Sequence, residues 1–149
     1  MSIFRFSTQA DHLDIENLFK KVRSSVSSSA LFNWPDKQIQ EELLRSHFFI
    51  HVSSSQVIQA FIAHRVSGDV VEIMALGTDP YLRQSGMMKA LLLDFVQKNS
   101  NKGFQVTLEV HEQNQPAISL YLKCGFREVH RRQSYYIDGA SALVMTYLS

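Results

Sequence analysis

The sequence predicts a single mixed α+β domain that spans residues 1–149. Hydrophobic residues make up 45% of the chain and charged residues 19%, a balance that suits one soluble domain with a substantial core. Segments of period-two hydrophobicity alternate with segments of helical periodicity along the whole chain. No internal repeat and no stretch of linker composition divides it, so we expect one core and one domain.

The N-terminal part predicts a strand and two helices. Residues 3–7 are typical of a short strand, and Thr8 and Asp11 then have the spacing of a helix capping box. The apolar residues that follow at helical intervals are Ile15, Leu18, Phe19 and Val22. A serine-rich loop is expected at residues 24–29, and Pro35 favours a second helix that begins there and ends near residue 45.

The remaining elements follow in order to the C-terminus. Three β-branched-rich runs separated by short polar turns predict an antiparallel meander, over residues 47–52, 57–66 and 70–76. A helix with one apolar face is expected from Gly86 to Val96, and strict alternation over residues 104–110 predicts a half-buried strand. The last elements are a helix over residues 114–124, which Gly125 ends, and strands over residues 126–131 and 142–148.

Charge and cysteine content exclude several classes of function. The formal net charge is only +1, so we expect neither direct nucleic-acid binding nor membrane attraction. Cys124 has no partner for an internal disulfide, and no Cys/His cluster has zinc spacing, which favours a reducing compartment and no metal. The N-terminus has no signal-peptide core, and no apolar run approaches the ~18 residues of a membrane span. A cytoplasmic monomer or homodimer is expected.

The segment Arg83-Gln84-Ser85-Gly86-Met87-Met88-Lys89 follows a strand and begins a helix. The free N–H groups of a first helical turn bind anions, and a glycine lets the backbone approach a phosphate closely. Arg83 and Lys89 add positive charge. In the alternative interpretation Gly86 only starts the helix and both basic residues are solvated. The segment is neither a Walker loop nor a Gly-x-Gly-x-x-Gly motif.

Arg83-x-x-Gly86 at the start of a helix resembles the pyrophosphate motif Arg/Gln-x-x-Gly-x-Gly/Ala of the GNAT-superfamily N-acetyltransferases. Further matches resemble the C-terminal half of the bacterial ribosomal-protein-alanine N-acetyltransferases. They are Leu108-Glu109-Val110-His111, Asn114, Ala117, Leu120-Tyr121, Gly125-Phe126, Arg132, Tyr135-Tyr136 and Ala142-Leu143-Val144-Met145. The likeness covers residues 72–145, and the N-terminal half matches mainly in element order. Met88 departs from the motif, which has a small residue there. Its backbone N–H is still able to bind an anion, while its long side chain could crowd the pyrophosphate or reshape the turn. As a pair, Met87 and Met88 are expected to pack in the core rather than to form a binding box.

The resemblance implies a GNAT fold, a central twisted mixed sheet of about seven strands flanked by about four helices. It also implies direct transfer of an acetyl group from acetyl-CoA to a primary amine. By the family pattern Glu109 is the base that takes the proton of the amine, and Tyr121 is the acid that protonates the departing thiolate. The alternatives are a solvent-facing strand carboxylate for Glu109 and a core aromatic for Tyr121. Glu72, on the preceding strand, competes for the role of base or contacts the substrate.

The same resemblance implies where acetyl-CoA binds, between two splayed parallel strands and at the following helix. The residues so assigned are Leu76, Gly77, Thr78, Arg83, Gln84, Ser85, Gly86, Met87, Met88, Lys89 and Asn114. For Asn114 a helix-capping role is an equal alternative. Tyr135 and Tyr136 resemble residues that line the acceptor groove, with simple packing as the alternative. The expected acceptor is the N-terminal amine of a protein such as a ribosomal protein. A small-molecule amine, or a non-catalytic acyl-CoA sensor, remains open.

Two other chemistries are weakly supported by the residues. Cys124 with His111 or His130 as base could form a nucleophilic pair, but the cysteine lies on an apolar helical face. Glu109 and His111 could share a metal ion, but a third ligand at suitable spacing is missing. Trp34 is expected to pack in the core.

Overall fold

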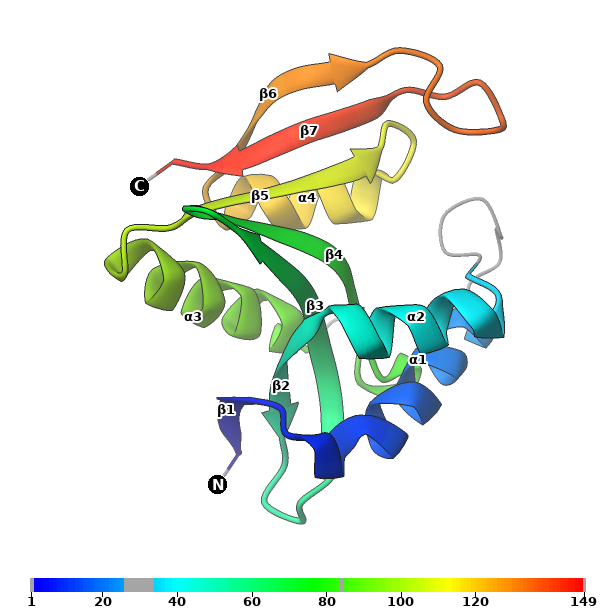
Figure 1. Ribbon diagram of the computed structural model, residues 1–149, viewed down its shortest axis with the longest axis vertical. Helices are drawn as coiled ribbons and strands as arrows, with labels where there is room; N and C mark the ends of the chain where they lie inside the picture. Colours follow the sequence, from blue (N-terminus) through cyan, green and yellow to red (C-terminus); the bar gives the residue numbers. More distant parts are fainter. Residues whose placement is uncertain (1, 26–33, 84, 149) are drawn as a thin grey trace.

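A seven-stranded mixed sheet organises the chain in the computed structural model, which describes residues 2–25, 34–83 and 85–148 (Figure 1). The strand order is β1-β2-β3-β4-β5-β7-β6, and only β4 and β5 run parallel. The strands are β1 (Ile3–Phe6), β2 (His47–Val52), β3 (Ile58–Ser67), β4 (Val70–Thr78), β5 (Gln105–His111), β6 (Phe126–Arg132) and β7 (Ala142–Tyr147). The helices are α1 (His12–Ser25), α2 (Asp36–Arg45), α3 (Met87–Asn101) and α4 (Gln115–Lys123). The predicted fold class is confirmed.

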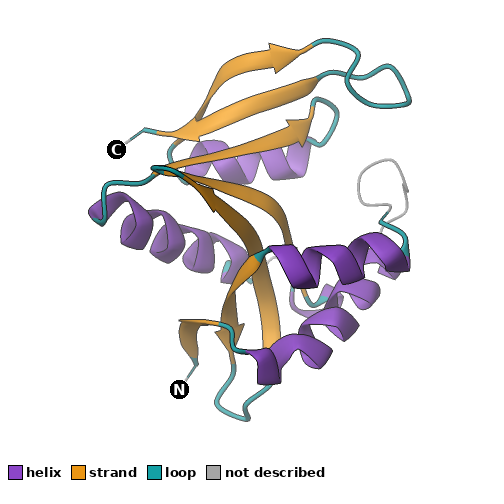
Figure 2. Ribbon diagram, viewed as in Figure 1, coloured by secondary structure: helices purple, strands orange, loops and turns teal. Residues whose placement is uncertain are grey.

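Helices cover both faces of the sheet and bury two separate cores (Figure 2). Successive residues of a strand point to opposite faces, so Phe48 and Ile50 of β2 pack against α1 and α2, whereas Phe49 packs against α3. Two short 3-10 turns, Gln9–Asp11 and Pro80–Leu82, join the predicted elements. None of the helices in the described part of the chain is long and apolar enough to cross a membrane.

The expected serine-rich loop is wrong at its beginning, because Ser24 and Ser25 form the last turn of α1. Their hydroxyl groups donate to backbone carbonyls of the same helix, Ser24 Oγ to Lys20 at 2.9 Å and Ser25 Oγ to Val22 at 2.7 Å. Such bonds let serine complete a helix end. The rest of the predicted loop lies outside the described residues.

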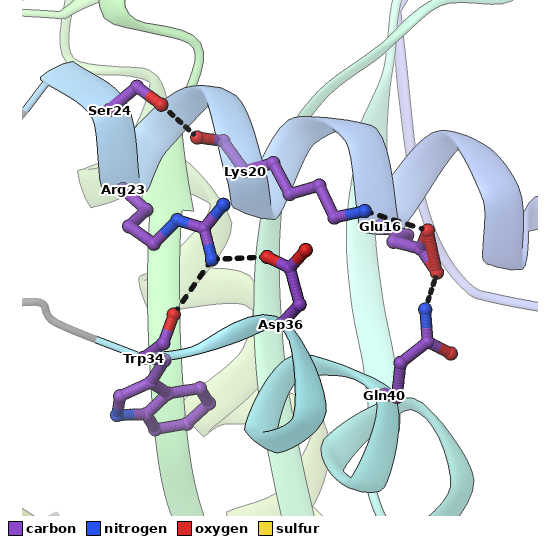
Figure 3. A network of polar contacts seen from close by, with 7 residues as sticks. All are labelled: Glu16, Lys20, Arg23, Ser24, Trp34, Asp36 and Gln40. Atoms are coloured by element: carbon purple, nitrogen blue, oxygen red, sulfur yellow. Dashed lines mark hydrogen bonds and ion pairs between the residues drawn. The ribbon is translucent and has the colours of Figure 1, made fainter.

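Polar contacts hold α1 against the start of α2 (Figure 3). The Arg23 guanidinium donates to the backbone carbonyl of Trp34 at 2.9 Å and to the Asp36 carboxylate at 2.6 Å. One turn further along, the Gln40 amide donates to Glu16. These contacts hold Trp34 beside α1, where its indole stacks on Phe19 and packs against the α1–α2 core.

The parallel strands β4 and β5 separate halfway along their length. They pair from Val70↔Gln105 to Ile73↔Leu108, and beyond that point β4 pairs only with β3 and β5 only with β7. The β3–β4 register skips Met74, which makes a bulge in β4 at the point of separation. Bulges bend strands and are common beside active sites. In Figure 1 the two strands run apart toward their C-terminal ends.

Candidate active site

A cavity of about 720 Å³ lies where β4 and β5 separate. Its described walls come from both strands, from α4, from the segment between β6 and β7, and from the start of α2. The predicted site residues that line it are Glu72, Leu76, Glu109, Asn114, Tyr121, Tyr135 and Tyr136. The tertiary structure therefore brings the expected base, acid and acceptor-contacting residues to one place.

Glu109 lies just beyond the last β4–β5 pair and is half-buried in this cavity. Its Oε1 forms an ion pair with Arg132, 2.8 Å from Nε, and the guanidinium also lies 5.4 Å from the ring centroid of Tyr135. The Glu109 Oε2 atom has no partner among the described residues. One carboxylate oxygen is thus held in place and the other is available to a ligand.

Tyr121 projects from α4 into the same cavity, with a side chain that is almost fully buried. Burial raises the pKa of its phenol, and the nearby Cys124 raises it further. The hydroxyl therefore keeps its proton and is a weaker acid than an exposed phenol. It makes no hydrogen bond with the described residues, so its proton is available for donation.

Asn114, Tyr136 and Glu72 complete the walls. Asn114 Oδ1 accepts the Ala117 N–H at 3.3 Å as the cap of α4, so the capping role and the cavity position occur together. Tyr136 is half-buried, and burial followed by the charge of Glu109 raises its pKa. Glu72 is exposed and forms no ion pair with any residue in the described ranges.

The cavity also contains groups that the sequence analysis missed or left without a role. From the sequence, His111 is a candidate only as a base for Cys124 or as a metal ligand, and Asp138 is not a candidate for any role. They form a contact of 2.8 Å between His111 Nε2 and Asp138 Oδ2. The Asp138-Gly139 pair is a turn signal visible in the sequence, but its contact with a residue 27 positions away is not. Ile137 and Trp34 also line the cavity.

The start of α3 has the geometry expected of an anion site. Gly86 is the N-cap with φ 79°, no described side chain caps the helix, and a Cβ added at Gly86 would meet no atom within 4 Å. Lys89 is exposed, while Arg83 donates to Ser25 Oγ at 2.9 Å. Ser85 Oγ donates to the Leu82 carbonyl at 2.7 Å. Gln84, also assigned to this site, lies outside the described residues.

Met88 packs in the core, as expected for the Met87-Met88 pair, and its side chain does not crowd this site. Its side chain is 9% exposed and packs in the core under α3 with Leu91 and Leu92, while Met87 packs at the edge of the same core. The side chain of the second residue of a helix points to one face of that helix. For Met88 this is the face that packs against the sheet. The backbone N–H groups at the helix start remain exposed to a ligand.

On the side that faces β5, the backbone of β4 from Met74 to Thr78 has no strand partner among the described residues. Leu76, Gly77 and Thr78 lie on this edge. A Cβ at Gly77 would come within 3.0 Å of the Phe61 ring, so packing against β3 explains the glycine there. The open edge leads directly through residues 79–86 to the start of α3.

The two alternative chemistries find no support in the described residues. Cys124 is buried, and burial raises the pKa of its thiol, which disfavours the nucleophilic thiolate. No three His, Cys, Asp or Glu side chains of the described ranges come together as ligands for a metal ion.

A mixed sheet that opens between two parallel strands, followed at the end of one of them by a helix without a side-chain cap, is typical of acyltransferases that use coenzyme A thioesters. The chain belongs to the acetyltransferase (GNAT) family, whose model matches residues 14–126. It is an acetyltransferase of that family, as the resemblance at Arg83-x-x-Gly86 implied.

Known relatives agree with this assignment. The N-alpha-acetyltransferase RimI of Mycobacterium tuberculosis is 30% identical over 121 residues, which cover 75% of this chain and 73% of that protein. The N-alpha-acetyltransferase of Sulfolobus acidocaldarius is 40% identical over 80 residues, 52% of this chain, and the match spans about half of that relative, 46%. The crystal structure of the ribosomal-protein-S18-alanine N-acetyltransferase from Escherichia coli superposes with a TM-score of 0.81 at 24% identity. It covers 99% of this chain and 93% of that one.

Proposed function

We propose that this protein transfers the acetyl group of acetyl-CoA to the N-terminal α-amine of a protein. The observation that carries the proposal is that Glu109 and Tyr121, from β5 and α4, line one cavity beside the open edge of β4. The names of the relatives support an α-amine acceptor, and one of them acts on a ribosomal protein. The cavity mouth, with exposed Tyr135 and Ile137, suits a polypeptide end that enters from solvent.

The proposed roles follow from the proton balance of the reaction. An α-amine has a pKa of about 8, so at pH 7 most of it is protonated and unreactive. Glu109 accepts the proton that the amine loses. Acetyl-CoA supplies a thioester, and a carbon–nitrogen bond forms as the carbon–sulfur bond breaks. Tyr121 donates its hydroxyl proton to the departing sulfur.

The binding of acetyl-CoA is proposed for the edge of β4 and the start of α3. Backbone groups at Leu76, Gly77 and Thr78 would bond the pantetheine arm and the thioester oxygen, with Asn114 beside them. The diphosphate oxygens would accept hydrogen bonds from the backbone N–H groups of the first turn of α3. The turn residues in this role are Arg83, Gln84, Ser85, Gly86, Met87, Met88 and Lys89. The exposed glycine and the burial of Met88 support this fit.

The base is tested by Glu109→Gln, with Glu72→Gln as the matched control on the neighbouring strand. Removing the proton acceptor is expected to lower kcat by about 10²-fold or more, because general base catalysis typically contributes that much. Acetyl-CoA affinity, measured by calorimetric titration, should stay within about twofold of wild type, since Glu109 is not assigned to cofactor binding. A kcat that falls only in Glu72→Gln would transfer the role of base to Glu72.

The acceptor is tested with three amines offered together with acetyl-CoA to the wild-type protein. They are a peptide beginning with free alanine, the same peptide with a blocked N-terminus and an internal lysine, and spermidine. Thiol release and fragment mass spectra should show acetylation of the α-amine of the first peptide alone. Turnover of spermidine alone would indicate a small-molecule enzyme. Binding of acetyl-CoA without turnover of any amine would indicate a sensor.

A further inference from the structure

His111 faces the proposed acceptor cavity from β5, two residues after Glu109, and the chemistry above does not use it. Its side chain is buried, with Nδ1 accepting the backbone N–H of Gln113 at 3.1 Å. A neutral imidazole carries one N–H, which must therefore be at Nε2. That N–H donates to Asp138 at 2.8 Å, in the segment of residues 133–141 that joins β6 to β7 (the β6–β7 segment).

Asp138 is also tied into its own turn. Its Oδ1 accepts the Ala140 N–H at 2.9 Å, and backbone bonds join Tyr136 to Ala140 at 3.1 Å and Gly139 to Tyr136 at 2.9 Å. The bond from Ala140, followed by that from His111, holds the pKa of Asp138 below its ordinary value, so the carboxylate is charged. Hydrogen bonds to a charged group are shorter and stronger than neutral ones. The two Asp138 oxygens thus link a compact turn to β5.

A second contact joins the same partners. The ring of Tyr136 stacks on the ring of His111, with centroids 4.7 Å apart and an interplanar angle of 30°. Tyr136 is half-buried, and the negative charge of Glu109 is close enough to raise its pKa after the larger effect of burial. Its neighbours Tyr135 and Ile137 stay exposed and line the cavity. The position in which His111 holds this segment therefore sets the position of the outer wall of the cavity.

We propose that His111 is a positioning residue for the acceptor: with Asp138 it holds the β6–β7 segment as the wall against which the first residues of an acceptor polypeptide bind. The apolar and aromatic surface of Tyr135, Tyr136 and Ile137 suits peptide side chains and backbone. The inference rests on the proposed function for the identity of the acceptor. The anchoring of the segment itself does not depend on it.

Kinetics test the effect on the acceptor. Asp138→Ala removes the carboxylate from an exposed position, and Asp69→Ala is the matched control in the exposed turn between β3 and β4. With acetyl-CoA and an alanine-initiated peptide, Asp138→Ala is expected to raise the acceptor KM about tenfold, the effect of losing one charged hydrogen bond. The acetyl-CoA KM and kcat should stay within about twofold. Asp138→Asn keeps an accepting oxygen and should restore part of the acceptor KM.

An equal rise of both KM values, or an unchanged acceptor KM in Asp138→Ala, overturns the proposal. So does a rise of the same size in Asp69→Ala.

Amide hydrogen exchange tests the anchor without turnover. His111→Phe keeps an aromatic ring against Tyr136 but removes both hydrogen bonds. Exchange should become faster in residues 133–141 and at Gln113, with the protection of α3 unchanged. If His111→Phe exchanges faster in these residues but the wild-type protein acetylates no amine, the proposed function fails and the anchor stands. Unchanged exchange in His111→Phe would overturn the anchor, whatever the activity of the wild-type protein.

Discussion

Glu72 and Glu109 present the same carboxylate from neighbouring parallel strands, and their surroundings separate them. Glu72 pairs with Thr107 in the closed part of the ladder and is exposed. Glu109 follows Leu108, the last residue of β5 that pairs with β4, so it lies where these two strands open, half-buried and held by Arg132. A base must be both held and accessible, and this combination favours Glu109.

Removal of the hydroxyl of Tyr121 tests its proposed role as the acid. Tyr121→Phe keeps the buried ring and removes only the hydroxyl, so we expect kcat to fall by about 10-fold to 10²-fold while both KM values change little. Tyr147→Phe is the control, because Tyr147 is half-buried on β7 but does not line the cavity. Steady-state kinetics measure both. Wild-type kcat in Tyr121→Phe would assign proton donation to another group or to water.

A second residue-scale prediction concerns Met88, which is packed under α3 rather than in the cofactor site. Met88→Ala leaves a cavity in the core and is expected to lower the free energy of unfolding by about 2–5 kcal/mol. Acetyl-CoA affinity of the folded protein should be retained. Urea unfolding and calorimetric titration check the two parts. The opposite pattern, a stable variant that binds acetyl-CoA much more tightly, would show that the methionine obstructs the site.

The proposed cofactor site combines two elements, the open end of β4 and the first turn of α3. The first turn of α3 follows the open end of β4 after a short connection, and the far side of the helix packs against the sheet. Glycines with positive φ occur at both ends, Gly86 at 79° and Gly103 at 86°. Only the first of these ends lies beside the open edge of β4, so the two glycines have the same backbone requirement but different neighbours.

Gly86 and Gly103 therefore form a matched pair for substitution. A Cβ at either glycine would meet no atom within 4 Å, so Gly86→Ala and Gly103→Ala introduce only backbone strain. Each should lower the free energy of unfolding by about 1–2 kcal/mol. Acetyl-CoA affinity should fall in Gly86→Ala alone, because the strain is relieved by moving the first turn of α3. Equal loss of affinity in both variants would remove the anion site from this turn.

At the scale of the whole molecule, the sheet separates two cores, and a histidine is buried in the one beneath α3. His64 is 3% exposed and packs on Phe95 and Phe6, with ring centroids 4.8 and 5.9 Å away. Burial lowers its pKa from 6.5 to about 4. The unfolded chain therefore binds a proton at pH values where the folded chain does not.

This difference predicts acid sensitivity. The contribution of neutral His64 is complete above pH 6.5 and is lost as the pH falls toward 4, up to about 3 kcal/mol in total. Asp11, whose pKa Arg5 lowers to about 2, acts only below pH 3.8. Urea unfolding at pH 7 and pH 5 should show a stability loss that His64→Leu reduces and that the exposed control His130→Leu does not. The same loss in all three proteins would place the sensitivity elsewhere.

Local patterns along the sequence were enough to predict the type and order of the strands and helices and the family of the protein. Periodicity of two or 3.6 residues and turn residues act over a few positions, so they are readable without a structure. The strand of Glu109 and the helix of Tyr121 follow from such local patterns. Their roles as base and acid came from the resemblance and stay predictions.

The surroundings of those residues depend on tertiary packing and cannot be read from local patterns. Tertiary packing joined Glu109 to Arg132 and brought His111 to Asp138 across 27 positions of sequence. It also opened β4 and β5 at the Met74 bulge. Such contacts depend on how whole strands and helices pack, because residues distant in sequence meet only after the sheet has formed. Local periodicity carries no information about that meeting.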